Sequence, residues 1–274
     1  MASKSGHAQI ADASLYYEIA GQGEPVVLVH GFALDSRMWN GQVRAWSPHY
    51  QVIRYDLRGF GKSSPGQDPY THADDLMGLL RHLEVPRATI VGLSLGGGAA
   101  INFALLYPEA ARALVTVDPT LGGFQFSSEF MAAQAALPRV ASEEGLTPAR
   151  ASWLRSPLFS HALRIPAAAN AIRTMVGEYS GRAWTNPDKG RRLKPPAIVR
   201  LAEINVPTLV VVGELDTADF RGIADTLAHG IRGARLVVVK GAGHIPNLEA
   251  PEFFNDVVLD FLKDVHAGGA HRGT

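Results

Sequence analysis

Short runs of apolar residues recur along this chain of 274 residues, and turn-forming residues bound each run. The runs cover residues 25–29, 51–55, 89–91, 113–117, 208–212 and 236–239. Continuous apolar runs are typical of strands that are buried on both faces of a parallel sheet. Stretches with helical periodicity lie between them, at residues 74–83, 95–107, 222–228 and 252–265. This order predicts an α/β protein with a mostly parallel open sheet and helices on both faces.

Two stretches depart from this pattern. Residues 9–19 alternate between apolar and polar side chains, which predicts an antiparallel hairpin at the edge of the sheet. Residues 125–200 are rich in Ala and Arg and contain several helical patterns but no strand-like run. We expect an inserted helical cap there, over the carboxyl ends of the strands. The predicted core is then residues 1–124 and 201–266, followed by a frayed, Gly-rich tail at 267–274.

Composition and charge exclude several classes of function. Lys and Arg total 26, as do Asp and Glu, so no net charge attracts nucleic acid or an anionic membrane. The absence of Cys excludes disulfides, thiolate metal sites and a cysteine nucleophile. The N-terminal residues do not resemble a signal peptide, and no apolar run is long enough for a membrane span. We expect a soluble, cytoplasmic protein without a metal, a nucleic-acid partner or a membrane partner.

The strongest chemical signal is the sequence Gly92-Leu93-Ser94-Leu95-Gly96, which follows a strand-like run and precedes a helical stretch. A G-x-S-x-G motif in this setting is typical of a nucleophile elbow, a tight strand-to-helix turn with a strained serine. Side chains at positions 92 and 96 would collide in such a turn, so glycine is required there. We predict that Ser94 is a nucleophile at the carboxyl edge of the sheet, beside the positive end of a helix dipole. The alternative is a serine that only caps a Gly-rich helix.

A nucleophilic serine needs a base to take its proton, and the base needs an acid to orient it. His244 fits the base, because it follows the last strand-like run on a Gly-bounded loop at the same edge of the sheet. Asp216 fits the acid, because it follows the preceding strand-like run at that edge. The chain order Ser94, Asp216, His244 is the order that this elbow uses. The alternatives for the acid are Asp118, which follows another strand-like run, and the neighbours Glu214 and Asp219.

A tetrahedral intermediate also needs donors for its oxyanion. The sequence His30-Gly31-Phe32 ends the first strand-like run, and we expect an oxyanion hole from the backbone N–H groups of Phe32 and Leu95. Gly31 permits the loop to approach the substrate closely. We expect His30 to brace this loop by hydrogen bonding and not to transfer protons.

Over nearly its whole length the chain resembles the α/β-hydrolase fold superfamily. The elbow, the predicted acid and base, and two further stretches carry this resemblance. Residues 56–63 (DLRGFGKS) match the superfamily's D-x-R-G-x-G-x-S turn, a structural brace there, and residues 243–251 (GHIPNLEAP) resemble its histidine loop. Within the superfamily the chain is similar to the capped esterases and the enol-lactonases that act on 3-oxoadipate enol-lactone and small esters.

The resemblance implies a reaction class. Epoxide hydrolases and haloalkane dehalogenases of this fold have aspartate at the position of Ser94, so they are excluded. The glycines at 92–98 lack the spacing of a dinucleotide site, and we expect no cofactor. We predict a serine hydrolase that cleaves a small carboxylic ester or lactone through an acyl-enzyme. The alternatives are a carbon–carbon bond hydrolase, a perhydrolase, or a low-turnover ligand receptor of this fold.

The predicted cap contains eleven Lys or Arg and five Asp or Glu. This positive surplus either attracts an acyl chain that ends in a carboxylate or only keeps the cap soluble, and we favour the second interpretation. Aromatic residues of the cap are candidates for the substrate pocket, although they would also serve as the cap's own core. They are Phe126, Phe130, Trp153, Phe159 and Trp184.

Overall fold

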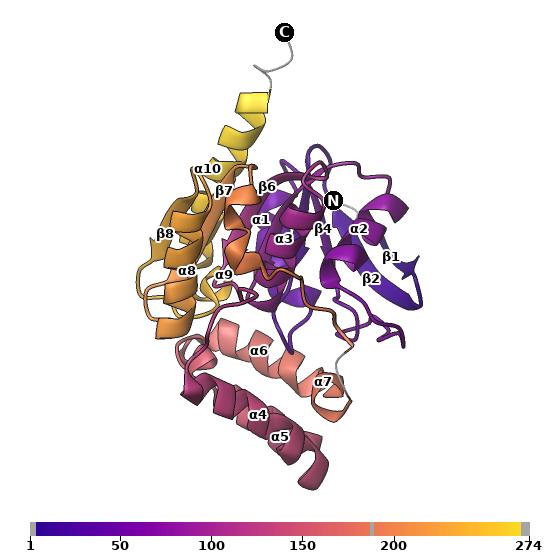
Figure 1. Cartoon of the computed structure of the whole chain (residues 1–274), viewed down its shortest axis with the longest axis vertical. Helices are drawn as coiled ribbons and strands as arrows, with labels where there is room; N and C mark the ends of the chain where they lie inside the picture. The colour runs from indigo at the N-terminus through magenta and orange to yellow at the C-terminus, as the bar shows by residue number, and fades with distance from the viewer. Residues whose placement is uncertain (1–3, 187–188, 270–274) are drawn as a thin grey trace.

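The computed structural model describes residues 4–186 and 189–269 and contains one sheet in the order β1-β2-β4-β3-β5-β6-β7-β8 (Figure 1). The strands are β1 (Lys4–Ile10), β2 (Ala13–Ala20), β3 (Pro25–Val29), β4 (Gln51–Tyr55), β5 (Ala88–Leu93), β6 (Ala111–Val117), β7 (Thr208–Gly213) and β8 (Arg235–Val239). β1 and β2 form an antiparallel hairpin at one edge, and β2 pairs antiparallel with β4. All other neighbouring strands pair in parallel. The predicted α/β class and its edge hairpin are confirmed.

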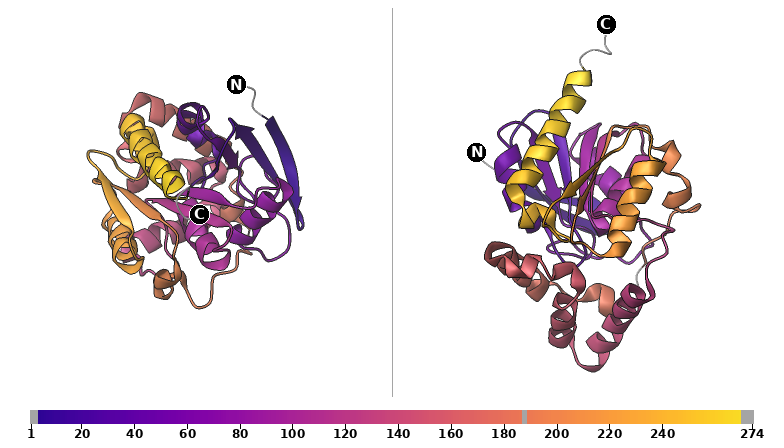
Figure 2. Two further views of the ribbon diagram at one scale, coloured as in Figure 1. Left: turned by 90° about the horizontal axis from the view of Figure 1, so that it is seen from above. Right: turned by 90° about the vertical axis from the view of Figure 1, so that its left-hand side faces the viewer.

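Helices cover both faces of the sheet (Figure 2). On one face α1 (Asn40–Trp46) packs against α10 (Pro251–Gly269), and on the other α2 (His72–His82) packs against α3 (Leu95–Leu106). The face of α3 also holds α8 (Ala218–Gly230), which packs against β7. No described helix combines the length and the apolar character that crossing a bilayer requires.

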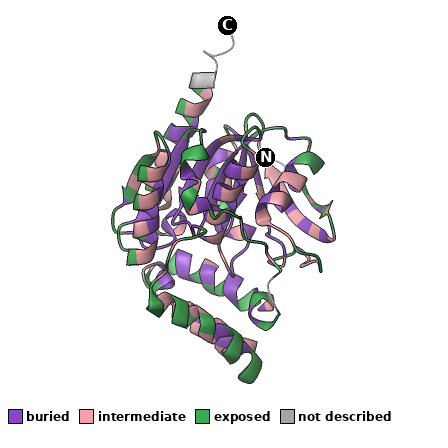
Figure 3. Ribbon diagram, in the orientation of Figure 1, coloured by how far each residue is buried: buried purple, intermediate pink, exposed green. Residues whose placement is uncertain are grey.

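The chain between β6 and β7 forms a separate layer of helices, which we call the helical insertion. It comprises α4 (Ser128–Glu143), α5 (Leu146–Leu154), α6 (Pro166–Glu178) and α7 (Arg182–Thr185), joined by the short 3-10 turns η2 (Pro157–Phe159) and η3 (Ala162–Arg164). Two more turns, η4 (Ala197–Val199) and η5 (Leu201–Glu203), lead back to the sheet. α6 buries one face, formed by Ala168, Ala169, Ile172, Met175 and Val176, and Figure 3 shows that α4 and α5 also present exposed faces.

The helical insertion lies at the edge of the sheet where the parallel strands end. α6 contacts η1 (Ser36–Trp39), which follows β3, and α9 (Pro246–Glu249), which follows β8. Both elements begin shortly after the carboxyl ends of their strands, so the helical insertion covers this edge of the sheet. The predicted boundaries of the cap at residues 125 and 200 remain predictions, and part of the predicted tail, residues 270–274, lies outside the described residues.

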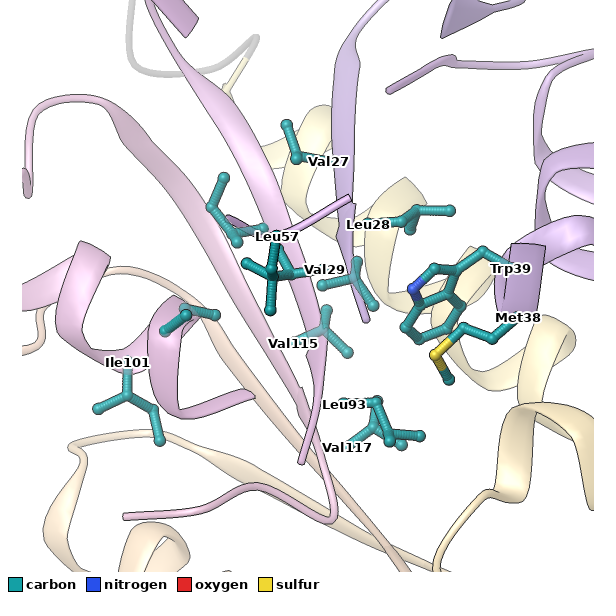
Figure 4. Close-up of a cluster of buried hydrophobic side chains, with 14 of the residues drawn as sticks. Val27, Leu28, Val29, Met38, Trp39, Leu57, Leu93, Ile101, Val115 and Val117 are labelled. Carbon is teal, nitrogen blue, oxygen red and sulfur yellow. The ribbon is translucent and has the colours of Figure 1, made fainter. Parts of the chain in front are cut away.

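The core is built from apolar side chains on both faces of the central strands. Figure 4 shows residues of β3 and β6 packed together with Leu57 and Leu93 from the neighbouring strand ends. All six residues of β5 and of β7 are buried, as continuous apolar runs predict. Each fully buried Val or Leu contributes about 1.5–3 kcal/mol. β8 differs, because it is the edge strand: Leu236 and Val238 are 37% and 46% exposed.

Candidate active site

Ser94 lies on the turn between β5 and α3, with φ +54° and ψ −115°. Its backbone is in a region that L-residues rarely adopt, and hydrogen bonds on both sides hold it there. The N–H of Ser94 donates to the Val117 carbonyl at 2.9 Å, and the Ser94 carbonyl accepts from the N–H groups of Gly98 and Thr120, each at 3.0 Å. The side chain of Ser94 makes no capping hydrogen bond to α3. The alternative interpretation, a serine that only caps the helix, does not fit this geometry.

The two glycines of the elbow have no room for a side chain. A Cβ on Gly92 would lie 2.2 Å from the carbonyl oxygen of Gly96. A Cβ on Gly96 would lie 2.3 Å from the carbonyl oxygen of Val29, at the end of β3. The close approach of α3 to β5 and β3 therefore depends on glycine at both positions.

His244 and Asp216 lie together at the carboxyl edge of the sheet. Asp216 follows β7 and His244 follows β8, and the His244 Nδ1 is 2.7 Å from the Asp216 Oδ2. Both side chains are buried. The other carboxylate oxygen of Asp216, Oδ1, accepts from the Thr217 N–H at 2.6 Å. This arrangement fixes the imidazole with its Nε2 edge turned away from the carboxylate.

The surroundings of Asp216 favour its ionised form. Burial alone would raise the pKa of Asp216, but the charge and hydrogen bond of His244 outweigh it, together with the neighbouring Asp118 and the hydrogen bond from the Thr217 N–H. The net result is that the pKa of Asp216 lies below its ordinary value. An ionised carboxylate is what the orienting acid of an Asp–His pair must be.

The loop that carries His244 is braced by Glu249. The Glu249 carboxylate accepts from the Gly243 N–H at 2.7 Å and from the Ile245 N–H at 2.9 Å. These bonds hold the residues on both sides of His244. Glu249 itself lies in α9, close to the end of the stretch that resembles a histidine loop.

The other candidates for the acid have different partners. Asp118 accepts from the Gly213 N–H at 3.0 Å through its Oδ1. Glu214 accepts from the Gly241 N–H, and Asp219 accepts from the N–H and the hydroxyl of Ser127. Asp216 is therefore the member of this group that the structure hydrogen-bonds to the histidine.

The loop after β3 runs beside the elbow. A Cβ on Gly31 would lie 3.5 Å from the Cβ of Ser94, so this loop passes close to the serine. No hydrogen bond from the backbone N–H of Phe32 or Leu95 is found within the described chain. Two unpaired amides next to the predicted nucleophile have the character of oxyanion donors.

His30 braces the loop after β3 by hydrogen bonds. Its Nε2 accepts from the Leu57 N–H at 2.9 Å, and its Nδ1 lies 2.8 Å from the Gly31 carbonyl oxygen. Burial lowers the pKa of His30, although the Asp56 charge, the Gly31 carbonyl and the Asp35 charge oppose the shift. A neutral imidazole that accepts at one nitrogen and donates at the other fits both contacts.

Aromatic side chains surround Phe32, whose ring lies 5.5 Å from that of Trp153 and 6.2 Å from that of Trp184. Its other neighbours are Phe60 at 5.6 Å and Tyr179 at 5.9 Å, between ring centroids. Sequence reasoning missed these two residues, although Phe60 stands in the stretch that matches a conserved turn of the superfamily. These rings form an apolar wall on the Phe32 side of the elbow.

A second aromatic group lies on the histidine side. The Phe220 ring is 4.3 Å from the His244 ring, and Phe126 and Phe130 each lie 5.8 Å from Phe220. Phe159 contacts Trp153 and is buried within the helical insertion. Sequence reasoning also missed Phe220, because its helical spacing in α8 matches that of an ordinary core residue.

Comparison with known proteins identifies this architecture. Residues 26–257 match the alpha/beta hydrolase family. A thermophilic esterase from Thermogutta terrifontis is 28% identical, with a TM-score of 0.81 over 96% of this chain and 99% of the esterase. The enol-lactonase from Burkholderia xenovorans is 27% identical, with a TM-score of 0.80 over 94% of this chain and all of the lactonase.

A third relative has another kind of substrate in its name. The 2-hydroxy-6-oxo-6-phenylhexa-2,4-dienoate hydrolase of Comamonas testosteroni is 28% identical over 95% of this chain and 95% of its own length. Each of these three proteins is named for a hydrolytic activity. The family match covers the parallel strands of the sheet, the elbow and the histidine loop, and this chain is a hydrolase that belongs to the alpha/beta hydrolase family.

Proposed function

We propose that this hydrolase cleaves a small carboxylic ester or lactone through an acyl-enzyme formed on Ser94. The observation that carries the proposal is the 2.7 Å hydrogen bond between the buried Asp216 and His244, at the same edge of the sheet as a serine held in a strained elbow. The likeness to an esterase and an enol-lactonase supports the same substrate class.

The proposed mechanism follows from these positions. His244, oriented by Asp216, takes the hydroxyl proton of Ser94 as the oxygen attacks the carbonyl carbon. The N–H groups of Phe32 and Leu95 donate to the oxyanion that develops. His244 then gives the proton to the leaving alcohol oxygen. Water, activated by the same histidine, hydrolyses the acyl-enzyme and returns the proton to Ser94.

We propose that the helical insertion, within residues 125–200, acts as a cap over this site. Two aromatic groups, around Phe32 and Phe220, then contact the two ends of the substrate, which favours apolar acyl and alcohol parts. Several arginines of the cap have partners at the surface, such as Arg139 with Glu143 and Arg200 with Glu203. These ion pairs support the interpretation that the positive surplus serves solubility.

The positive surplus of the cap either attracts a carboxylate-bearing substrate or only keeps the cap soluble. These two interpretations predict different effects of substrate charge and salt concentration on the rate. We expect similar kcat/KM for a neutral ester and a carboxylate-bearing ester of the same length, at both low and high salt. A preference for the charged ester that vanishes at high salt would instead assign steering to the basic residues.

A second candidate is hydrolysis of a carbon–carbon bond with the same residues. The similarity to the 2-hydroxy-6-oxo-6-phenylhexa-2,4-dienoate hydrolase favours it, because that name gives an oxo-dienoate as substrate. The test compares a short p-nitrophenyl ester with a vinylogous diketone, using Ser94→Ala as the control. We expect faster turnover of the ester. Turnover of the diketone alone would support the second candidate, and ligand-induced thermal stabilisation without turnover would support a receptor.

A further inference from the structure

Asp118 occupies an unusual place beside the proposed triad. It follows β6 directly, it is fully buried, and its backbone has φ +41°. The register explains its position: Leu93 pairs with Val117, and Val117 pairs with Val211. Asp118 therefore leaves the sheet between the elbow and the strand that leads to Asp216. A buried aspartate with a positive φ indicates a local requirement that outweighs the strain.

The two oxygens of Asp118 have different surroundings. Oδ1 accepts from the Gly213 N–H at 3.0 Å. Oδ2 is buried, and no donor to it is found within the described chain. A carboxylate oxygen that is charged, buried and without a donor is unfavourable. A protonated Oδ2 carries no charge and is itself a donor, so it does not require a donor from the protein.

A carboxyl group close to Asp118 is that of Asp216. One atom each from Asp118, Asp216 and His244 lies within 4.8 Å of the other two. Two carboxyl groups in contact do not both ionise readily. The pKa of Asp118 is raised well above its ordinary value by burial, then by the charge of Asp216 and a hydrogen bond to it. His244 and the Thr217 N–H both favour the charge on Asp216 instead.

We propose that Asp118 is a positioning residue that stays protonated and donates the hydrogen bond of its Oδ2 hydroxyl to the Asp216 carboxylate. This inference rests on the proposed function, since it concerns the same triad. The bond restricts the rotation of Asp216, whose other partners are the Thr217 N–H and His244. It also withdraws negative charge from the carboxylate, which weakens the attraction between this carboxylate and a positively charged imidazole beside it.

The charged and titratable groups around this pair come from several elements. Asp216 follows β7 and His244 follows β8, while Glu249 of α9 adds a negative charge that acts on Asp118. The oxygens of Glu249 accept from two backbone N–H groups of the histidine loop. His161 of the helical insertion lies beside Gly243. Among these groups, Asp118 and His244 each place an atom within 4.8 Å of an Asp216 carboxylate oxygen.

The test uses two substitutions of Asp118. One keeps a hydrogen-bond donor at this position, and the other removes it. In Asp118→Asn the amide oxygen replaces the acceptor of the Gly213 N–H, and the amide N–H replaces the hydroxyl donor. Asn also tolerates a positive φ. In Asp118→Gly the backbone conformation remains allowed, but the donor is lost. The rate of labelling by a fluorophosphonate is measured against pH, with kcat and KM for a p-nitrophenyl ester and thermal unfolding in parallel.

The proposal predicts that Asp118→Asn keeps the parent's pH of half-maximal labelling, whereas Asp118→Gly raises it by about one unit. It also predicts that Asp118→Gly lowers kcat on the order of tenfold with KM little changed, because one charge-assisted hydrogen bond is lost. A lower half-maximal pH in Asp118→Asn would overturn the proposal, because it would mean that the substitution removed a negative charge. An unchanged half-maximal pH in Asp118→Gly with only reduced thermal stability would assign a structural role and overturn it too.

A second readout separates this inference from the proposed function. Ring carbon signals of ¹³C-labelled histidine report the protonation of His244 without turnover, and a His244→Gln variant assigns them. If the parent protein does not react with the fluorophosphonate, the proposed function fails. The ring carbon signals still test the hydrogen bond, because their titration midpoints can be compared in the parent, Asp118→Asn and Asp118→Gly. If the glycine variant does not fold, the comparison of the parent with Asp118→Asn remains as the test.

Discussion

At the residue scale, the strained backbone of Ser94 lowers the stability of the protein. Its φ of +54° is unfavourable for any side chain with a Cβ, by about 1–2 kcal/mol, and glycine escapes this penalty. We expect Ser94→Gly to unfold at a higher urea concentration than Ser94→Ala, with both variants inactive. Equal midpoints for the two variants would contradict the presence of strain at the elbow.

The proposed orienting acid, Asp216, gives a second prediction at this scale. Asp216→Asn keeps the shape of the side chain but favours the wrong tautomer of His244, and we expect kcat to fall by about 10⁴-fold. Asp118→Asn is the matched control on the neighbouring strand and should have a far smaller effect. Steady-state kinetics with a p-nitrophenyl ester measures both. The reverse ranking would transfer the role of the acid to Asp118.

The sequence predicts some of these residues and not others. Ser94 stands in a local motif, and His244 and Asp216 follow strand-like runs, so their common edge follows from the alternation of strands and helices. The contact of Asp118 with Asp216 depends on the register of β6 against β7, which no local pattern reports. The proximity of Phe220 to His244 depends on how α8 packs, for the same reason.

At the element scale, the elbow depends on glycine where α3 meets the sheet. A Cβ on Gly96 would approach two carbonyl oxygens of the β3 end within 2.6 Å, so we expect Gly96→Ala to lose at least 2 kcal/mol of stability, on the order of an overpacked core. Gly177 in α6 is the matched control, because a Cβ there meets nothing within 4 Å.

We expect Gly177→Ala to be neutral or stabilising by about 0.5–1 kcal/mol, since alanine favours the helix. Urea denaturation of both variants measures the difference. If Gly96→Ala were as stable as Gly177→Ala, the close contact at the elbow would not exist.

The sequence also predicts most elements but not all of their bounds. The helix expected at 74–83 begins at His72, because the Thr71 hydroxyl accepts from the Asp74 N–H and caps it. α1 is short and has no clear sequence signal. Its Trp46 stacks on Phe254 of α10, and no local pattern reports such a contact between distant segments. Buried runs predict the central strands well, whereas the exposure of β8 depends on its place at the edge.

At the scale of the whole molecule, cross-strand ion pairs make stability depend on pH. Burial opposes the charge of Glu18 in β2, but hydrogen bonds from Tyr16 and Arg54 outweigh it and hold the pKa of Glu18 below its ordinary value. Arg54 is the residue directly opposite Glu18 on β4. Because the pKa of Glu18 is lower in the folded protein than in the unfolded chain, its charge adds to the free energy of unfolding above about pH 4. This contribution is lost as the pH falls.

We expect the free energy of unfolding to fall as the pH drops below about 4, and to fall less steeply in Glu18→Gln. Glu144→Gln, at an exposed helix end, is the control and should follow the parent. Urea midpoints between pH 3 and 7 measure this dependence. Parallel curves for the parent and Glu18→Gln would show that the pair does not contribute.

The proposed nucleophile, acid and base come from three loops at one edge of the sheet, which the helical insertion covers. We propose that Ser94 is the reactive group of this assembly. Labelling with a fluorophosphonate, followed by peptide mass mapping, tests it most directly. We expect a single adduct on the peptide that carries Ser94, with none in Ser94→Ala and slow formation in His244→Gln. An adduct on another residue, or equal labelling of Ser94→Ala, would contradict it.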